Sequence, residues 1–376
     1  MTIRAFTVRL YPTKEQEISF IRHIGCSRFI YNYMLELQNK NYKDGNKFIS
    51  RFDMIKLLTP LKKQENYFWL NGVSNKTLQI SCTDLSYAFK RFFNKISRYP
   101  KFRSKKLAKE AFPISSEQLY FENNTVLNIQ KVGKVKYKCD KQFIYGKNKC
   151  KYTNPRVSSR NGKWILTFGM ECENQTPTLS NDSMGIDLGI KELAVVAFGN
   201  QKFVFHNINK SKKMRSLEDR IKHVQRSMAR KYSLNKKSTN NSERDRVKLK
   251  GLYAKQTNIR NNNLHQITHK LITMNPKRVV MEDLNVSGMM KNKHLSKAIQ
   301  EQKFYEFIRQ MKYKSEWNSI EFIQADRFYP SSKTCSDCGT IKKELKLSDR
   351  TYRCPVCGLE IDRDYNAAIN LMKYNV

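Results

Sequence analysis

Hydrophobic and polar positions divide the first half of the chain into strand-like and helix-like stretches. Residues 2–11 alternate well enough to predict a β-strand, which Pro12 ends. From Thr13, which we expect to cap a helix, apolar positions predict a helical region that continues with interruptions to about residue 98. Short alternations broken by Asn and Gly then predict strands over about 118–172. We therefore expect residues 1–12 and 116–173 to form a β-barrel, with residues 13–115 as a helical insertion.

The second half has the order of elements of a mixed α/β unit and follows a linker at residues 174–182 (NQTPTLSND). Strands are predicted at 184–187 and 193–198, with Gly189 in the turn between them. A polar, long-helical stretch at 211–260 comes next, and the remaining predicted elements are a strand at 278–282, a helix with apolar residues at Phe304, Phe307, Ile308 and Met311, and a strand near 320–325. The resulting β-β-α-β-α order predicts an α/β fold.

Four cysteines near the C-terminal end have the spacing of a metal site. Cys335/Cys338 and Cys354/Cys357 are two CxxC pairs separated by 15 residues, which predicts a four-thiolate zinc site. The other five cysteines are scattered and do not look like a disulfide framework, so we expect a reducing compartment. They are Cys26, Cys82, Cys139, Cys150 and Cys172.

The charge balance indicates a polyanionic partner. The chain has 376 residues, with 71 Lys and Arg against 33 Asp and Glu, a net charge of +38. Many phosphate contacts would give such a chain affinity for nucleic acid through counterion release. An anionic membrane surface is the alternative, but no Lys/Arg-rich amphipathic helix stands alone, and no apolar run approaches the ~20 residues of a membrane span. The N-terminus lacks the apolar core of a signal peptide. We expect a cytoplasmic, nucleoid-associated protein with no membrane partner.

Two segments concentrate the positive charge. Residues 89–109 hold nine Lys/Arg, five Phe/Tyr and no acid. We expect Phe89, Phe92 and Phe93 to be core and the cations to contact phosphate. The cations named as candidates are Lys90, Arg91, Lys101, Arg103 and Lys105. Residues 211–260 hold 16 Lys/Arg against four acids, which favours a helical hairpin that faces nucleic acid over a solvated helical face.

Three acids each stand at the end of an apolar strand or the start of a helix: Asp187, Glu282 and Asp364. An acid at the end of a buried strand is costly unless it binds a cation or pairs. Hard oxygen ligands suit Mg²⁺, and two such ions about 4 Å apart can drive phosphodiester cleavage. Each acid alone could equally cap a helix. Together, in a basic α/β chain, they indicate an RNase-H-like nuclease.

Four stretches resemble, in their order, the TnpB family: GIDLGIKELAVV, VVMEDLNVSGMMKNKHLSKAI, DRFYPSSKTCSDCG and YRCPVCGLEIDRDYNAAINL. The members of this family are insertion-sequence-encoded, RNA-guided DNA endonucleases related to type V CRISPR effectors. The opening RLYPTKEQEISFIRHIGCSRFIYNYML resembles the family's helix-turn-helix region, and AFKRFFNKISRYPKFRSKK resembles its next block. The resemblance spans nearly the whole chain.

The resemblance implies a RuvC-like nuclease domain at 183–334 and 359–376, with a zinc ribbon at 335–358 inserted into it. The β-barrel becomes a wedge-like domain and residues 13–115 a recognition domain. Asp187, Glu282 and Asp364 become the triad that binds two Mg²⁺ ions, with Asp362 as a supporting residue, and the four cysteines hold one Zn²⁺. The partners implied are a guide RNA and a double-stranded DNA target, which the protein cleaves beside a short flanking motif.

The sequence offers less evidence about which residues contact the flanking motif than about the acids and the cysteines. Lys76, Gln79 and Thr83 lie at helical spacing and have side chains suited to groove contacts, although a solvent-facing polar stripe explains them equally well. Arg327 could support the site by contacting phosphate or could pair with Asp326. Two other functions stay open: a guide-directed DNA-binding regulator, which would be expected to lack an intact triad, and a transposase, which would need no RNA.

Overall fold

The computed structural model describes residues 2–105, 110–139, 146, 151–235, 239–346 and 349–374. The chain divides into two compact units, Met1–Cys172 and Glu173–Val376, and is mixed α/β. Cys150 and Lys106–Lys109, which belong to segments singled out from the sequence, lie outside the described residues. Among the described residues, no helix is both long and apolar enough to cross a membrane.

An antiparallel sheet of seven strands forms the β part of the first unit. The strands are β1 (Thr2–Tyr11), β2 (Ala111–Pro113), β3 (Leu119–Phe121), β4 (Val126–Ile129), β5 (Gly133–Lys138), β6 (Thr153–Arg160) and β7 (Lys163–Cys172), in the order β2-β6-β7-β1-β5-β4-β3. The N-terminal strand β1 lies between β7 and β5, so its pairing with the later β-rich region is as the sequence predicts. The end strands β2 and β3 make no ladder with each other among the described residues, so strand pairing does not close the predicted barrel.

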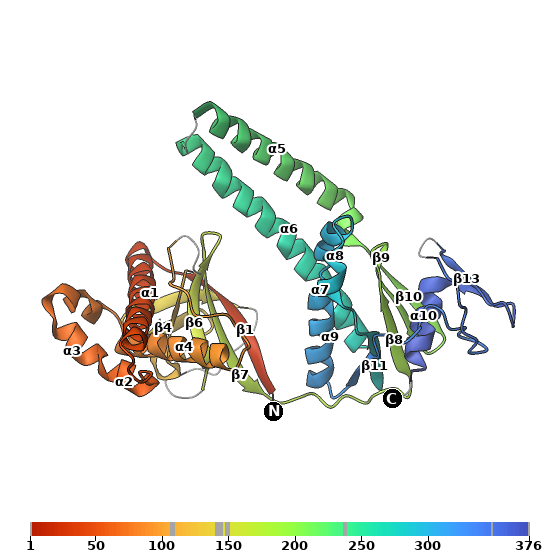
Figure 1. Cartoon of the computed structure of the whole chain (residues 1–376), viewed down its shortest axis with the longest axis horizontal. Helices are drawn as coiled ribbons and strands as arrows, with labels where there is room; N and C mark the ends of the chain where they lie inside the picture. Colours follow the sequence, from red (N-terminus) through yellow and green to blue (C-terminus); the bar gives the residue numbers. More distant parts are fainter. Residues whose placement is uncertain are drawn as a thin grey trace. The chain divides into compact units, whose positions relative to one another are not determined.

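Helices make up the rest of the first unit (Figure 1). They are α1 (Lys14–Lys43), α2 (Arg51–Lys56), α3 (Leu58–Lys63), α4 (Asn75–Phe93) and the 3-10 helices η1 (Glu65–Gly72) and η2 (Ser116–Gln118). Thr13 caps α1 as predicted, in a capping box with Gln16. Phe20 from α1 lies in the core of the sheet, whereas Ile30 of the same helix shares a second core with Leu85 of α4.

The aromatic residues at the end of α4 correct one prediction. Phe89 is buried, but Phe93 is 61% exposed and Phe92 is half-buried, so the three are not all core. The reason is that the last turn of α4 borders a cavity instead of another helix.

A five-stranded sheet organises the second unit. Its strands are β8 (Ser183–Leu188), β9 (Glu192–Phe198), β10 (Gln201–His206), β11 (Arg278–Glu282) and β12 (Glu321–Ala325), in the order β10-β9-β8-β11-β12. The first three form an antiparallel meander, whereas β8, β11 and β12 are parallel. The two strands β13 (Thr351–Arg353) and β14 (Glu360–Asp362) pair separately beside the cysteines.

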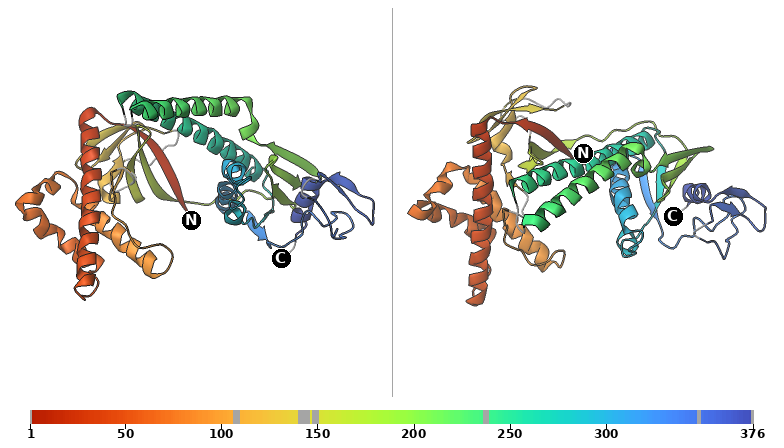
Figure 2. Two further views of the ribbon diagram at one scale, coloured as in Figure 1. Left: turned by 45° about the horizontal axis from the view of Figure 1, so that its top comes forward. Right: turned by 90° about the horizontal axis from the view of Figure 1, so that it is seen from above.

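Helices flank this sheet on both faces, and a long helical hairpin projects from it (Figures 1 and 2). They are η3 (Ile208–Lys210), α5 (Lys212–Asn235), α6 (Asn240–Ile272), α7 (Val286–Met289), α8 (Ser296–Gln302), α9 (Phe304–Trp317) and α10 (Arg363–Met372). Side chains of α6 and α9 share a core with Ile186 and Met281 on one face. On the other face α10 packs Ala368 against Val195 and Leu371 against Val280. The predicted hairpin at 211–260 is the long antiparallel pair of α5 and α6, joined by a small core around Leu217 and Leu252.

Candidate active site and metal centre

The first two acids of the predicted triad lie on neighbouring parallel strands. Ile186 of β8 is aligned with Met281 of β11, so the residues that follow them, Asp187 and Glu282, lie next to each other at the carboxyl ends of the two strands. Side chains alternate between the faces of a strand. Because Val280 packs against α10, Glu282 belongs to the same face, and the adjoining Asp187 lies on that face of β8.

A glycine lets α10 approach this face closely. A Cβ atom on Gly185 would lie 2.0 Å from the carbonyl oxygen of Ala368 and 2.4 Å from the backbone nitrogen of Met372. No side chain fits there, because both neighbours are backbone atoms of the helix. The close contact holds α10 against β8, with Asp364 in its first turn.

The three acids lie near enough for their charges to affect one another. Burial raises the pKa of Asp187 well above its usual range, and the carboxylates of Glu282 and Asp364 raise it further, while the Arg363 guanidinium opposes them. Such mutual repulsion makes the cluster favourable for a cation, which would relieve it.

Two of these carboxylates already have partners in the protein. The hydroxyl group of the buried Ser331 donates a hydrogen bond to Glu282, and Arg363 lies 3.3 Å from Asp364. As the side chains lie, the three acids therefore do not close around one point. Over the described parts of the chain, the four cysteines are the one group of three or more Cys, His, Asp or Glu ligands close enough together to hold an ion.

The two residues predicted to support the site have different roles. Asp362 is the N-cap of α10: its side chain accepts a hydrogen bond of 2.9 Å from the Tyr365 amide, and it lies 3.4 Å from Lys202. Arg327 pairs with Asp283 at 2.6 Å, not with Asp326, whose side chain caps the turn at Phe328. Of the two alternatives for Arg327, pairing with Asp326 is therefore excluded, because the guanidinium pairs with Asp283 at the end of β11; contact with phosphate stays a prediction.

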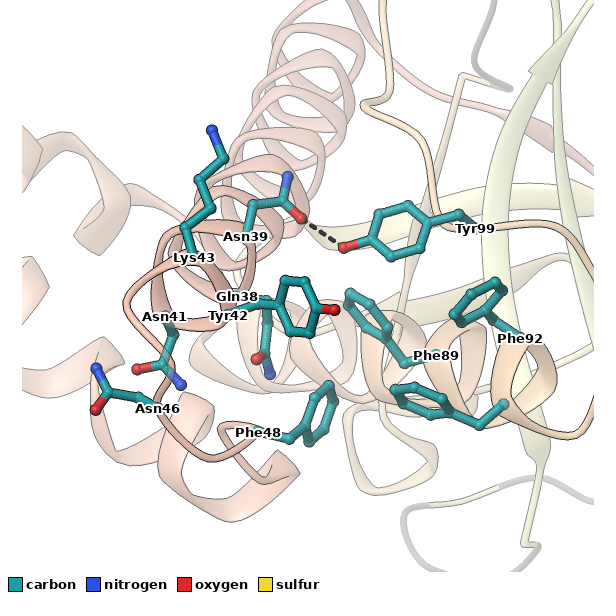
Figure 3. Close-up of a pocket in the computed structure, with 11 residues that line it drawn as sticks. Gln38, Asn39, Asn41, Tyr42, Lys43, Asn46, Phe48, Phe89, Phe92 and Tyr99 are labelled. Carbon is teal, nitrogen blue, oxygen red and sulfur yellow. Dashed lines mark hydrogen bonds between the residues drawn. The ribbon is translucent and has the colours of Figure 1, made fainter.

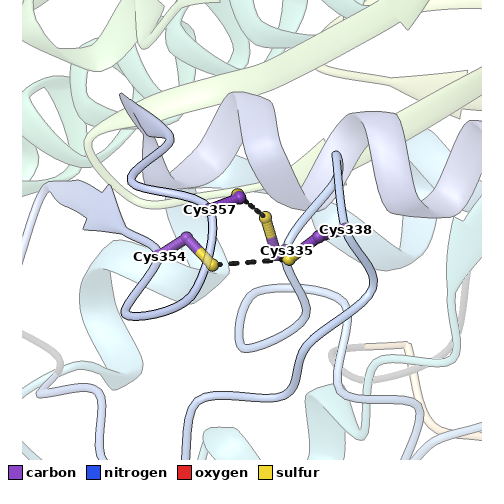
Figure 4. Close-up of side chains that lie close together, drawn as sticks. All are labelled: Cys335, Cys338, Cys354 and Cys357. Carbon is purple, nitrogen blue, oxygen red and sulfur yellow. Dashed lines mark hydrogen bonds between the residues drawn. The ribbon is translucent and has the colours of Figure 1, made fainter.

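The four cysteines have the geometry of a zinc site (Figure 4). Their sulfurs lie within 4.8 Å of one another, with Cys335 3.6 Å from Cys357 and Cys338 3.5 Å from Cys354. A tetrahedral ion with Zn–S bonds of about 2.3 Å would place its sulfur ligands about 3.8 Å apart. The donor set and the spacing thus fit Zn²⁺.

Each CxxC pair ends in a glycine with positive φ, Gly339 at +76° and Gly358 at +75°. This conformation, which favours glycine, turns the chain back, so that the Cys335 amide donates to the Thr340 carbonyl and the Cys354 amide to that of Leu359. The Thr340 side chain and backbone also lower the pKa of the Cys338 thiol, to about 6, which favours the thiolate that binds metal.

Sequence reasoning missed the residues that connect the cysteine loop to α10. The side-chain amide of Asn370 donates to the carbonyl oxygens of Ser331 and Thr334, both at 2.7 Å. Asn366 donates to Thr334 at 2.7 Å and accepts a hydrogen bond from the Ser336 amide at 3.0 Å. The available signal was two asparagines one turn apart on the buried side of an apolar helix, where polar groups need partners.

The nucleic-acid contacts predicted as single residues all belong to the first unit and have mixed surroundings, whereas the predicted hairpin at 211–260 belongs to the second unit. Lys90, Arg91, Lys101 and Lys105 are exposed, and Lys76 is exposed but 3.6 Å from Glu117. Gln79 and Thr83 are half-buried, and the Thr83 hydroxyl donates to the Gln79 carbonyl. The Arg103 guanidinium lies 3.6 Å from the centre of the Tyr31 ring. It therefore already makes a cation–π contact within the first unit. The structure gathers Lys90 and Arg91 at one end of α4 and Lys76 and Gln79 at the other.

Comparisons with known proteins match nearly the whole chain. Three family models match: "Helix-turn-helix domain" over residues 1–47, "Probable transposase" over 167–293 and "Cas12f1-like, TNB domain" over 304–371. A Streptomyces pristinaespiralis protein named "Putative RNA-guided DNA endonuclease" is 30% identical over 369 residues, which cover 98% of this chain and 88% of that protein. "Putative RNA-guided DNA endonuclease InsQ" of Escherichia coli K12 is 31% identical over 386 residues, covering 98% and 92%.

One solved structure shares the fold along the chain. It is the cryo-EM structure of a Cas12f1–sgRNA–target DNA complex, with a TM-score of 0.63 at 14% identity, covering 99% of this chain and 98% of the other. At this identity the likeness concerns the fold alone.

Proposed function

The chain belongs to the TnpB family, and on that premise we propose that it is an RNA-guided endonuclease, encoded by a transposable element, that cleaves double-stranded DNA next to a short flanking motif. The observation that carries the proposal is that Asp187 and Glu282 adjoin each other at the carboxyl ends of β8 and β11, on the face where α10 packs with Asp364 in its first turn. The strand order, an antiparallel meander followed by parallel strands, supports an RNase-H-like, RuvC-like nuclease domain.

The carboxylate cluster fits magnesium by its chemistry. Asp187, Glu282 and Asp364 supply hard oxygen ligands. Burial first, and then repulsion from the other two carboxylates, raises the pKa of Asp187, and a divalent cation would relieve both costs. When bound, two Mg²⁺ ions would activate a water and stabilise the leaving oxygen of the phosphodiester. The chain itself orients the carboxylates: Ser331 holds Glu282, Asp362 caps the helix that carries Asp364, and Arg363 offsets part of the negative charge.

The cysteine module would hold one Zn²⁺ through Cys335, Cys338, Cys354 and Cys357. We propose a structural role for it, since all four protein ligands are thiolates and no coordination position would be left open for a reaction. Its contribution is to fold residues 335–358 as a ribbon within the nuclease domain.

We propose that the remaining parts bind nucleic acid. Residues 1–12 and 116–173 would form the wedge-like domain, 13–115 the recognition domain, 174–182 the linker, and 183–334 with 359–376 the nuclease domain. Support comes from the exposed cations of α4 and of the α5–α6 hairpin, which suit a guide RNA and its DNA target. Lys76, Gln79 and Thr83 remain the candidates for contact with the flanking motif.

The test is to sequence the RNA that co-purifies with the full chain and to add that guide to a plasmid library carrying the matched target beside randomised flanks. We expect Mg²⁺-dependent double-strand breaks, and loss of breaks but not of RNA binding in Asp187→Ala, Glu282→Ala and Asp364→Ala. Glu316→Ala, which removes an exposed acid on α9, is the matched control. RNA-guided binding without cleavage by the intact chain would indicate a regulator instead, and DNA-end joining without RNA would indicate a transposase.

A further inference from the structure

A cavity of about 600 Å³ in the first unit is lined almost entirely by aromatic rings and polar side chains (Figure 3). It lies between the C-terminal ends of α1 and α4, and its size is that of a small-ligand site, about 300–1,000 Å³. Tyr42 and five other Phe and Tyr residues line the cavity, so the apolar part of its wall consists of aromatic rings. The lining residues are Gln38, Asn39, Asn41, Tyr42, Lys43, Asn46, Phe48, Phe89, Phe92, Phe93 and Tyr99.

These rings leave apolar surface uncovered. Tyr42 is 83% exposed and Phe93 is 61% exposed, although Phe89 beneath them is buried. Phe89 and Phe93 stack with ring centres 6.1 Å apart, and Phe48 meets Phe89 edge-on at 5.2 Å. The wall is therefore a packed aromatic surface with an open side, which favours a flat, π-faced ligand.

Polar groups at the rim match the edges of a nucleobase. The Tyr99 hydroxyl donates a 2.6 Å hydrogen bond to the Asn39 Oδ1 atom, which orients that amide and leaves its NH₂ group to donate to a ligand. Gln38 also lines the cavity, but its side-chain amide is already used. It donates a hydrogen bond to the Ile49 carbonyl and accepts one from the Ile49 amide.

The positive charge around the cavity indicates that the ligand is part of a polyanion. Segments 38–48 and 89–99 carry one acid, Asp44, and seven cations: Lys40, Lys43, Lys47, Lys90, Arg91, Lys95 and Arg98. None of the seven forms an ion pair with another described residue. Aromatic platforms flanked by unpaired cations are the means by which proteins hold single strands, because each base stacks while its phosphates meet the cations.

We propose that this cavity binds an unpaired base of single-stranded RNA, the base stacking against Tyr42 and Phe93 while the neighbouring phosphates contact Lys43 and Lys90. The inference rests on the proposed function, in which that RNA is the guide. RNA is favoured over the DNA target because a folded guide offers unstacked bases in its loops and ends at all times, whereas a DNA strand is single only while the guide displaces it.

The first experiment is ultraviolet crosslinking of the full chain with its co-purified RNA, followed by mass spectrometry of the peptides. We expect ribonucleotide adducts on peptides containing Tyr42 or Phe93. Adducts confined to other parts of the chain, or deoxyribonucleotide adducts at these peptides, would overturn the proposal.

The second experiment measures affinity with two probes: the transcribed co-purified RNA and a fluorescein-labelled 12-nucleotide oligoadenylate. The double variant Tyr42→Ala/Phe93→Ala should bind oligoadenylate about 10-fold more weakly or worse. The slope of log affinity against log salt should not change, because no charge is lost. Lys43→Ala should instead reduce that slope by about 0.7. Tyr87→Ala, which removes an exposed ring from the same helix outside the cavity, is the control.

The outcomes separate this inference from the proposed function. If the wild-type chain cleaves its guided target and the double variant, still folded by its melting curve, binds both probes normally, the cavity assignment is wrong and the nuclease stands. If the double variant loses oligoadenylate binding although the wild type never cleaves, the cavity assignment stands and the nuclease proposal fails. Tighter binding of the wild type to oligodeoxyadenylate than to oligoadenylate would contradict the assignment to RNA.

Discussion

At the scale of single residues, the candidate active site depends on what surrounds each carboxylate. Asp187 is surrounded by other acids, Glu282 receives the Ser331 hydroxyl, and Asp364 lies beside Arg363. Asp362, only two positions from Asp364, has a more exposed side chain than Asp364, and that side chain caps the N-terminus of α10. Position on the helix, not residue type, thus gives these two aspartates different surroundings.

Ser331→Ala should lower the cleavage rate about 10-fold while guide RNA binding stays unchanged. The variant removes the hydrogen bond that orients Glu282, and loss of such supporting contacts typically costs 10- to 100-fold in metal affinity or activity. Single-turnover cleavage at a series of Mg²⁺ concentrations is the measurement, and the loss should shrink at high Mg²⁺. A rate equal to that of Ser332→Ala, the neighbouring serine, would argue against this role.

Gly185→Ala should destabilise the second unit by about 1–3 kcal/mol or more, because the added methyl group would overlap backbone atoms of α10. Gly251→Ala is the matched control: a Cβ there meets nothing within 4 Å, and alanine in the interior of α6 should stabilise by about 0.5–1 kcal/mol. Urea unfolding of both variants checks the pair. Equal stability of the two would show that α10 does not pack as closely as described.

At the scale of elements, α10 links the sheet to the cysteine module. One side packs Ala368 and Leu371 on the strands, and the other holds the loop before Cys335 through Asn366 and Asn370. The helix that bears Asp364 is therefore fixed from both sides. This arrangement predicts that disrupting the cysteine module would also disturb the position of Asp364.

Removing the metal should unfold the ribbon and weaken cleavage together. Structural zinc sites contribute folding free energy, so a chelator or Cys335→Ser should lower the melting temperature of the second unit. Zinc content, thermal melting and cleavage are the three measurements. Cys172→Ser, a cysteine outside the cluster, should leave all three unchanged. An active wild-type protein that contains no zinc would contradict the assignment.

At the scale of the whole molecule, the main property is the large excess of positive charge. A net charge of +38 is spread over both units, in α4 and its following segment and in the α5–α6 hairpin. This excess remains after all 33 Asp and Glu are counted, so the folded chain carries substantial self-repulsion that a polyanion would relieve.

Guide RNA affinity should accordingly fall steeply with salt. Each phosphate contact made by a cation contributes about 0.7 to the slope of log affinity against log salt for single-stranded regions, so several contacts should give a steep line. Filter binding from 50 to 500 mM NaCl measures it. A flat response would exclude phosphate contact as the main source of affinity.

Several features followed from the sequence alone because their causes are local. The strand at residues 2–11, the Thr13 cap and the α5–α6 hairpin come from short-range periodicity and capping chemistry. The four cysteines were recognisable because metal ligation imposes a fixed spacing, and the family because its motifs occur in a fixed order.

Only the tertiary structure decided which groups meet across long separations. It showed that position 185 has no room for a side chain, because backbone atoms of α10 lie against it. It also showed that Ser331 hydrogen-bonds to Glu282, 49 positions away, and that Arg327 pairs with Asp283. It also left Phe93 exposed beside a cavity, where helical periodicity had predicted core. The physical reason is the same in each case: close packing and hydrogen bonding depend on distances between elements, which periodicity along one element does not encode.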